Sequence, residues 1–402
     1  SVTVTEAAVI YNNVSYSSLD DALVQINGTE DGKLVILQDV TVSRSVIING
    51  GNLTVTSSGE TNPVMKLTTA HTGEAFIVKS GSLTLKNITL DGGAIWSGSD
   101  HFVMRRGTTN KGRSVNSPLI TMSGGTVNLN EGTILQNNVA NWTSACVVMT
   151  AGTLNINGAY LQDCYGGSHG GVIYSSSSNS VINMTGGKIR RNQARSSTGG
   201  LCADTGTKLT ISGGEIAYNY TAGRAGGIFI NGSLNISGDT DIHDNYAAGN
   251  GGGVLHLSGT FTMQGGKIRN NTALSNGGGI ASLGGTLTLQ NGEISGNTAS
   301  AQANGVYLES SVIVTDDHIP AGVTDTVYSP KTITMTLDGN GTGTRSEQII
   351  HYLGTYELPD IERNGYQFLG WFTQAEGGEQ VYSGDRITNK TNVTLYAHWL
   401  LT

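Results

Sequence analysis

The chain contains little proline, little charge and no long apolar run, and each of these absences excludes a class of protein. Only 5 of its 402 residues are proline and 13% are charged, so it is neither a proline-rich linker nor a highly charged disordered chain. No apolar run approaches the ~18 to 20 residues that cross a bilayer. A formal net charge of −8 opposes phosphate backbones, so we expect no nucleic-acid partner and no membrane insertion.

Cysteine is also scarce. Cys146, Cys164 and Cys202 are odd in number and lack C-x-x-C spacing, which argues against a disulfide framework and a zinc site. We predict buried free thiols, no metal and no cofactor. The sequence starts at Ser1 without a signal segment and ends at Thr402 without an anchoring tail, so we expect an intracellular protein or an excised mature piece.

Glycine, in contrast, is abundant, at 58 of 402 residues, and it belongs to a repeated unit. Apolar anchor residues recur about every 26 residues, a period typical of a solenoid whose units stack on one another. The anchors are Val127, Leu154, Ile182, Leu209, Leu234, Phe261, Leu287 and Val312, with weaker units around Val35, Leu53 and Leu83.

Each unit predicts short strands. In residues 209–230, alternation at period two places Leu209 and Ile211 on one face and Thr210 on the other. Paired glycines and recurring β-branched residues exclude a helix. We therefore predict an all-β fold, in which residues 1–330 form a right-handed parallel β-helix of about ten or eleven coils.

Two columns of residues recur at fixed distances after the anchors. Seven positions on, or eight for Ile242, we predict an aliphatic core column: Ile134, Leu161, Ile189, Ile216, Ile242, Ile268 and Ile294. Ten positions on, or eleven for Asn245, asparagine amides are expected to hydrogen-bond from coil to coil: Asn137, Asn192, Asn219, Asn245, Asn271 and Asn297. Cys164 occupies this second column in its own coil, so we expect it to be structural.

Both ends of a β-helix need covering, because exposed strand edges promote polymerisation. We predict a capping helix at about residues 17–27, with Ser18 as its N-cap, and a closure of the other end by residues after Val312. An insertion at residues 93–117 breaks the period and is too long for a simple turn.

Outward-facing residues beside the asparagine column are the first candidate ligand site. Asp163 joins Arg191, Tyr218 and Asp244 in one predicted column, and three tyrosines form a neighbouring one. Tyrosine rings suit the apolar face of a sugar, and charged groups suit its hydroxyls. The alternative is that turn positions simply tolerate these residues. The predicted glycan-binding residues are Tyr165, Arg191, Tyr218, Tyr220, Asp244 and Tyr246.

The insertion is the second candidate. Trp96, Arg105 and Arg106, together with Lys111 and Arg113, concentrate positive charge and an aromatic ring on an acidic protein. An anionic glycan suits such a segment, and a mobile surface loop is the alternative.

Catalysis has weaker support. A further outward column is predicted to form a salt-bridge ladder instead, and a β-helix hydrolase needs carboxylates about 5 to 9.5 Å apart. Asp163 and Asp244 share a column but lie about 14 Å apart by strand spacing, so no catalytic residue is predicted. The ladder comprises Tyr160, Lys188, Glu215, Asp241, Lys267 and Glu293.

Aromatic residues, only 6% of the chain, crowd into its last seventy or so residues, where the period ends. The segments LDGNGTG, LPDIERNGYQFLGWFTQAEGG and ITNKTNVTLYAHW resemble the Listeria-Bacteroides repeat, the internalin-type B repeat of bacterial surface proteins, over about residues 331–402. The matching residues are Gly365, Tyr366, Phe368, Gly370, Trp371, Gly377, Gly378, Leu395, Tyr396, Ala397 and Trp399.

This resemblance implies a small β-grasp-like domain of exported bacterial proteins, used as a stalk or spacer. The β-helix resembles the pectin-lyase-like superfamily at the level of fold, and its units resemble repeats of bacterial surface adhesins. We therefore expect a secreted or cell-wall-attached adhesin or glycan-binding protein, monomeric and non-catalytic, whose partner is a glycan or a host or surface glycoprotein. The alternatives are a polysaccharide lyase or glycoside hydrolase on the same scaffold, and a structural surface spacer.

Overall fold

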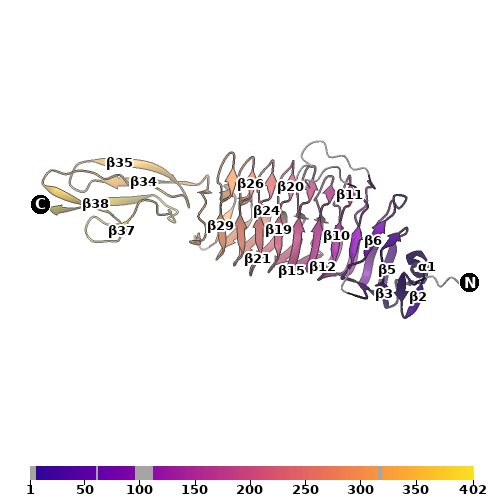
Figure 1. Ribbon diagram of the computed structural model, residues 1–402. Helices are drawn as coiled ribbons and strands as arrows, with labels where there is room; N and C mark the ends of the chain where they lie inside the picture. Colours follow the sequence, from indigo (N-terminus) through magenta and orange to yellow (C-terminus); the bar gives the residue numbers. More distant parts are fainter. Residues whose placement is uncertain (1–5, 60–61, 96–111, 316–318) are drawn as a thin grey trace, which may run out of the picture.

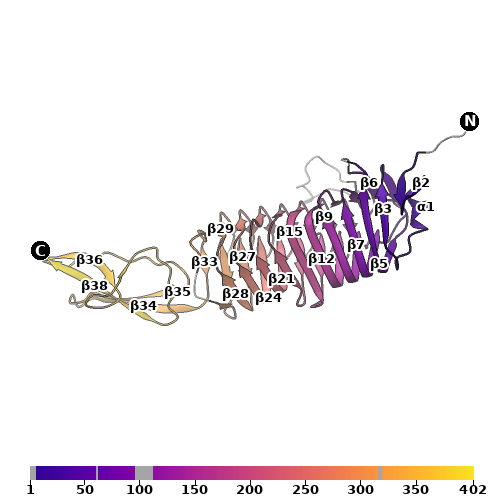
Figure 2. The same ribbon diagram turned by 90° about the horizontal axis from the view of Figure 1, so that it is seen from below.

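The computed structural model describes residues 6–59, 62–95, 112–315 and 319–402. It is elongated and almost entirely β: a solenoid of about ten turns is followed by a separate five-stranded sheet (Figure 1). The predicted all-β solenoid architecture is therefore confirmed. In the second view, the same stack of strands again leads from the N-terminal cap to the C-terminal sheet (Figure 2).

The N-terminal end is covered by a hairpin and a short helix. Strands β1 (Val9–Tyr11) and β2 (Val14–Tyr16) pair with each other, and β1 also pairs antiparallel with β3 (Gly32–Ile36). Helix α1 (Leu19–Leu23) follows, and the hydroxyl of its predicted N-cap Ser18 accepts a hydrogen bond from the backbone N–H of Asp21 at 3.2 Å. The capping helix is confirmed but is shorter than predicted, at five residues.

The coils form one continuous parallel sheet that bends round the solenoid. Long strands run round a corner and so pair along two or more faces; they are β5 (Val46–Ser57), β7 (Phe76–Lys86), β9 (Ile120–Asn130), β12 (Val147–Gln162), β15 (Ser180–Arg190), β21 (Ile228–Ile236) and β24 (Val254–Met263). Short strands complete the coils; they are β4 (Val40–Val42), β6 (Val64–Leu67), β8 (Thr89–Asp91), β10 (Ile134–Gln136), β14 (Ile173–Ser175), β17 (Leu201–Ala203), β18 (Lys208–Ile211), β19 (Glu215–Ala217), β22 (Asp241–His243), β25 (Lys267–Arg269), β27 (Ile280–Ser282), β28 (Thr286–Leu289), β29 (Glu293–Ser295), β31 (Val306–Leu308), β32 (Ile313–Val314) and β33 (Val327–Tyr328).

A second, narrow sheet of seven two-residue strands runs along one corner of the solenoid. Each strand follows a sharp turn at the end of the preceding face. Its members are β11 (Val139–Ala140), β13 (Tyr165–Gly166), β16 (Gln193–Ala194), β20 (Tyr220–Thr221), β23 (Tyr246–Ala247), β26 (Thr272–Ala273) and β30 (Thr298–Ala299).

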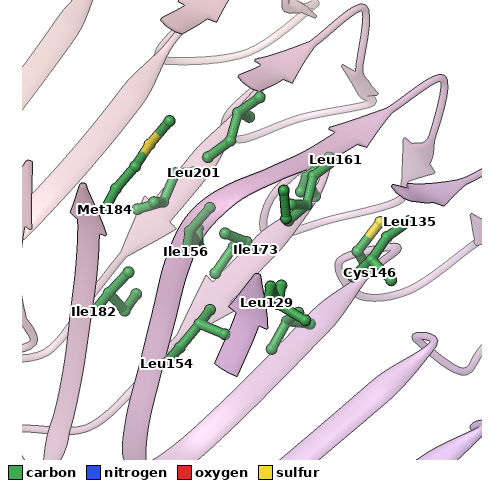
Figure 3. Packing of buried hydrophobic residues seen from close by; sticks show 14 of the residues in the cluster. Leu129, Leu135, Cys146, Leu154, Ile156, Leu161, Ile173, Ile182, Met184 and Leu201 are labelled. Carbon is green, nitrogen blue, oxygen red and sulfur yellow. The ribbon is translucent and has the colours of Figure 1, made fainter. Parts of the chain in front are cut away.

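Aliphatic side chains fill the interior, as period-two alternation requires. Leu154, Ile156 and Leu161 all lie on β12 and are fully buried against the same positions of adjacent coils (Figure 3). One predicted member of the core column is wrong: Leu135, not Ile134, pairs with Leu161 and is fully buried. The three cysteines are free and buried, as predicted, and the Cys146 and Cys164 sulfurs lie 3.2 Å apart.

The asparagine column is a one-way chain of hydrogen bonds. From Asn192 onward, each side-chain N–H donates to the amide oxygen of the next coil at 2.9–3.0 Å and to a backbone carbonyl of the preceding coil. Asn297 donates to the carboxylate of Asp325, and this is the last hydrogen bond of the asparagine column. At the other end the predicted member Asn137 is wrong, because its neighbour Asn138 is the buried one.

His256 is a buried imidazole inside the solenoid, and we predict that it destabilises the fold in acid. Its Nδ1 lies 2.9 Å from the Ser282 hydroxyl, and burial lowers its pKa from 6.5 to about 4. Between these two pKa values, the imidazole is protonated in the unfolded chain and neutral in the folded chain. The free energy of unfolding has its full value above pH 6.5, and it decreases by about 3 kcal/mol as the pH drops from 6.5 toward 4.

Urea unfolding at pH 7.5 and pH 4.5 checks this prediction. His256→Gln, which cannot be protonated, is expected to lose that part of the pH dependence. An unchanged difference between the two pH values in the variant contradicts the assignment.

The C-terminal sheet has the strand order β35-β34-β38-β36-β37. Its strands β34 and β38 are parallel and the other pairs are antiparallel, as expected for a β-grasp-like sheet. Trp371 packs in its core beside Phe368. The strands are β34 (Thr332–Asp338), β35 (Arg345–His351), β36 (Tyr366–Phe372), β37 (Gln380–Val381) and β38 (Val393–Leu401).

Residues just after β35 close the open end of the solenoid. Leu353 is fully buried and belongs to the solenoid core rather than to the core of the C-terminal sheet. The guanidinium of Arg386 donates to the backbone carbonyls of Leu353, Val323 and Asp325, which ties the two parts together. The predicted closure after residue 312 is thus provided by the last strand of the solenoid and by the C-terminal sheet.

Candidate functional site

The turn between the core column and the narrow sheet projects one residue outward in each coil. These residues share a left-handed backbone, with φ of 55° at Asp163, 54° at Arg191, 57° at Tyr218 and 51° at Asp244. The next residue turns inward and supplies the asparagine column. The predicted outward column is therefore present in the structure, and we call it, together with the tyrosines of the narrow sheet, the turn face.

Arg191 is engaged within the turn face. Its guanidinium donates to both carboxylate oxygens of Asp163, at 2.8 and 2.7 Å, and to Gln162 at 3.2 Å. These hydrogen bonds raise the pKa of Arg191. The pair positions two coils against each other, so Arg191 offers a ligand only the part of its fork that Asp163 leaves open.

Two of the three predicted tyrosines stack. The rings of Tyr220 and Tyr246 lie 5.0 Å apart at an interplanar angle of 11°, so one face of each ring covers the other. Tyr165 lies in the same column but Gln193 separates it from Tyr220. A sugar therefore meets the outer faces and edges of this column, not the space between the two stacked rings.

Tyr218 and Asp244 meet at His243. Tyr218 is 39% exposed, and its ring lies edge-on to the His243 imidazole, with centroids 5.4 Å apart. Nδ1 of His243 is 2.7 Å from a carboxylate oxygen of Asp244. The arrangement presents an exposed aromatic ring beside a partly exposed carboxylate, while His243 between them is buried. The ring can contact the apolar face of a sugar and the carboxylate its hydroxyls.

The insertion candidate is only partly described. Trp96, Arg105 and Arg106 lie outside the described residues, so their role stays a prediction. Arg113 is 3% exposed, and its guanidinium donates to backbone carbonyls and to Asn138 Oδ1 at 2.8 Å. The proposed ligand role is wrong for Arg113, which holds the first coils and the start of the asparagine column together.

The predicted salt-bridge ladder forms in part. Its members are partly exposed, and such pairs contribute little to stability. Asp241 is in register with Lys267 of the ladder, but its ion pair is with Arg269, two residues after Lys267. The ion pairs are Lys188–Glu215 at 2.8 Å, Arg269–Asp241 at 2.8 Å and Lys267–Glu293 at 3.8 Å.

The structure also shows a surface groove on the solenoid that the sequence analysis did not predict. A groove of about 740 Å³ crosses three successive coils, at residues 131–134, 157–160 and 185–188, where paired or single glycines precede the charged column. The glycines that precede Tyr160 and Lys188 are the signal in the sequence, because their lack of side chains leaves the surface hollow. We call it the glycine groove.

No helix among the described residues is long and apolar enough to cross a membrane. No curated protein and no solved structure matches the chain. Residues 332–398 match the family model of the Listeria-Bacteroides repeat domain, which confirms the predicted resemblance of the C-terminal residues. The chain thus joins a β-solenoid to a Listeria-Bacteroides repeat domain, a domain typical of extracellular bacterial surface proteins.

Proposed function

We propose that this protein is a secreted or cell-wall-attached bacterial adhesin that binds glycans through the turn face, without catalysis. The extracellular setting of the repeat domain supports this proposal. So does the chemistry of the turn face, where tyrosine rings lie near carboxylate and guanidinium groups.

The observation that carries the proposal is the backbone of Tyr218. A left-handed backbone costs an ordinary side chain about 1 kcal/mol or more, whereas asparagine and glycine adopt it readily. Other coils place Asn137, Asn270 or Gly296 at this position. Tyr218 keeps a costly backbone and an exposed ring, and strained residues of this kind gather at functional sites.

Replacing Tyr218 with asparagine separates stability from binding. We expect a thermal midpoint that is unchanged or higher, because asparagine relieves the strained backbone, and glycan binding that is several-fold weaker. Asn270→Gly, at the equivalent position two coils on, is the matched control and should bind as the wild type does. A Tyr218→Asn variant that unfolds earlier and binds normally contradicts the proposal.

The stacked pair gives a second prediction. Replacing Tyr220 and Tyr246 together with alanine is expected to abolish the glycan binding that the turn face provides. The stability loss should stay near 1 kcal/mol, the value of one aromatic pair at a partly exposed position. Glycan pull-down and a thermal melt measure the two effects. Unimpaired binding moves the glycan site away from this pair.

A further inference from the structure

The glycine groove is a concave site that the proposed function does not use. Its floor includes Gly132, Gly158 and Gly187, with φ of 76°, 99° and 92°. A Cβ on Gly187 would lie 2.2 Å from the Ala159 carbonyl oxygen. Side chains are therefore excluded from this part of the floor, and the backbone itself is open to a ligand.

The walls are polar and carry one aromatic ring. Asn62 donates to the Gly132 carbonyl at 2.9 Å and so stands at the rim. Tyr160 is in register with Lys188 of the next coil. The Lys188 ammonium group is neutralised by Glu215, 2.8 Å away. The groove is also lined by the Glu131 carboxylate. Amides, a phenol ring, a neutralised ammonium group and a carboxylate suit a neutral polyhydroxylated ligand better than an anion.

One group of the groove lacks a hydrogen bond that its counterpart makes. Thr133 lines the groove and is 1% exposed, and its hydroxyl has no hydrogen-bond partner among the described residues. Thr240 occupies the same coil position, since Ile134 and Asp241 follow them in one column, and is equally buried. Its hydroxyl donates to the Ser237 carbonyl at 2.8 Å. A buried hydroxyl without a partner is costly, and a ligand in the groove can supply one.

We propose that the glycine groove binds a neutral β-linked oligosaccharide of about two or three sugar units that lies along the solenoid axis. A β-linked chain repeats about every 5 Å, close to the ~4.8 Å between coils, so successive sugars meet equivalent positions of successive coils. The Arg190 guanidinium lies over the Tyr160 ring, 5.1 Å from its centroid, so a sugar contacts the edge or the other face of this ring. The amides and Thr133 meet hydroxyls. This site shares its ligand class with the proposed function but none of its residues.

Ligand-observed NMR titration of the full chain tests the proposal. The probes are cellotriose and triacetylchitotriose, with the α-linked maltotriose as a control for geometry and trigalacturonate as a control for charge. We expect at least one of the two β-linked probes to bind and both controls to bind more weakly. Failure of both β-linked probes, or stronger binding of trigalacturonate, overturns the proposal.

Two matched threonine variants locate the site. Thr133→Val removes a hydroxyl without a partner, so it should raise the thermal midpoint and weaken trisaccharide binding several-fold. Thr240→Val removes a satisfied hydroxyl, so it should lower the midpoint and leave binding unchanged. Tyr160→Ala is expected to weaken binding about tenfold, the loss of one aromatic contact. Wild-type binding by Thr133→Val and Tyr160→Ala overturns the assignment.

The proposed site on the turn face and the proposed site in the glycine groove can be tested independently of each other. If the groove holds the trisaccharide, the Tyr220→Ala, Tyr246→Ala double variant keeps that binding. If that double variant loses trisaccharide binding while the Thr133 and Tyr160 variants retain it, the turn face is the site and the groove is not.

Discussion

Replacing Leu353 with alanine is expected to lower the free energy of unfolding by about 2 to 5 kcal/mol. Leu353 is fully buried at the open end of the solenoid, although it follows a strand of the C-terminal sheet. Truncating it leaves a cavity against the last coil. It also loosens the contact by which Arg386 joins the two parts of the chain.

Urea unfolding followed by circular dichroism measures this effect, with Leu369→Ala as the matched control. Leu369 lies on the same C-terminal sheet but is 43% exposed, so its truncation should cost little. We also expect the Leu353 variant to aggregate earlier on heating, because the end of the solenoid is less well covered. Equal stability losses in the two variants contradict the role of Leu353 as a closing residue.

Replacing Asn219 with alanine is expected to cost about 3 kcal/mol or more. Its amide oxygen accepts from both the backbone and the side chain of Asn192, and its side-chain nitrogen donates to Asn245 and to the Ile189 carbonyl. Alanine removes these four buried hydrogen bonds. The side-chain nitrogen of Asn192 keeps the Leu161 carbonyl and the amide oxygen of Asn245 keeps the Asn219 backbone N–H, whereas the buried backbone N–H of Asn192 loses its partner, at about 1 to 3 kcal/mol.

Thr210→Ala is the control, since Thr210 is an exposed residue of the same coil. Its stability should stay within about 0.5 kcal/mol of wild type. A thermal melt of Asn219→Ala that superimposes on the wild-type melt contradicts the hydrogen-bonded column.

The period of the repeat predicted most of the solenoid because each coil places the same residue types at the same turn. It failed by one position in the coil of Ile134, where Ile134 and Leu135 are both aliphatic and Asn137 and Asn138 are both asparagine. Either register satisfies the pattern. The choice between the two registers depends on the backbone geometry of the turn at Gly132, which cannot be read from the spacing of the residue types.

Contacts between segments far apart in the sequence were the other part of the structure that the sequence did not predict. Nothing in the local pattern marks Leu353 as a core residue of the solenoid, because the contact joins residues outside the period. The outward turn column was predictable from the repeat. The pairing of Arg191 with Asp163, and the left-handed backbone of Tyr218, became visible only once the turn geometry was known.

The most direct test of the proposed function is a glycan array probed with the full chain at neutral pH, paired with a reducing-end assay on the polysaccharides that bind. We expect saturable binding to a restricted set of glycans and no release of reducing ends. Release of reducing ends shows a hydrolase or lyase on the same scaffold. Absence of binding to every glycan on the array contradicts the adhesin proposal and leaves a structural surface spacer.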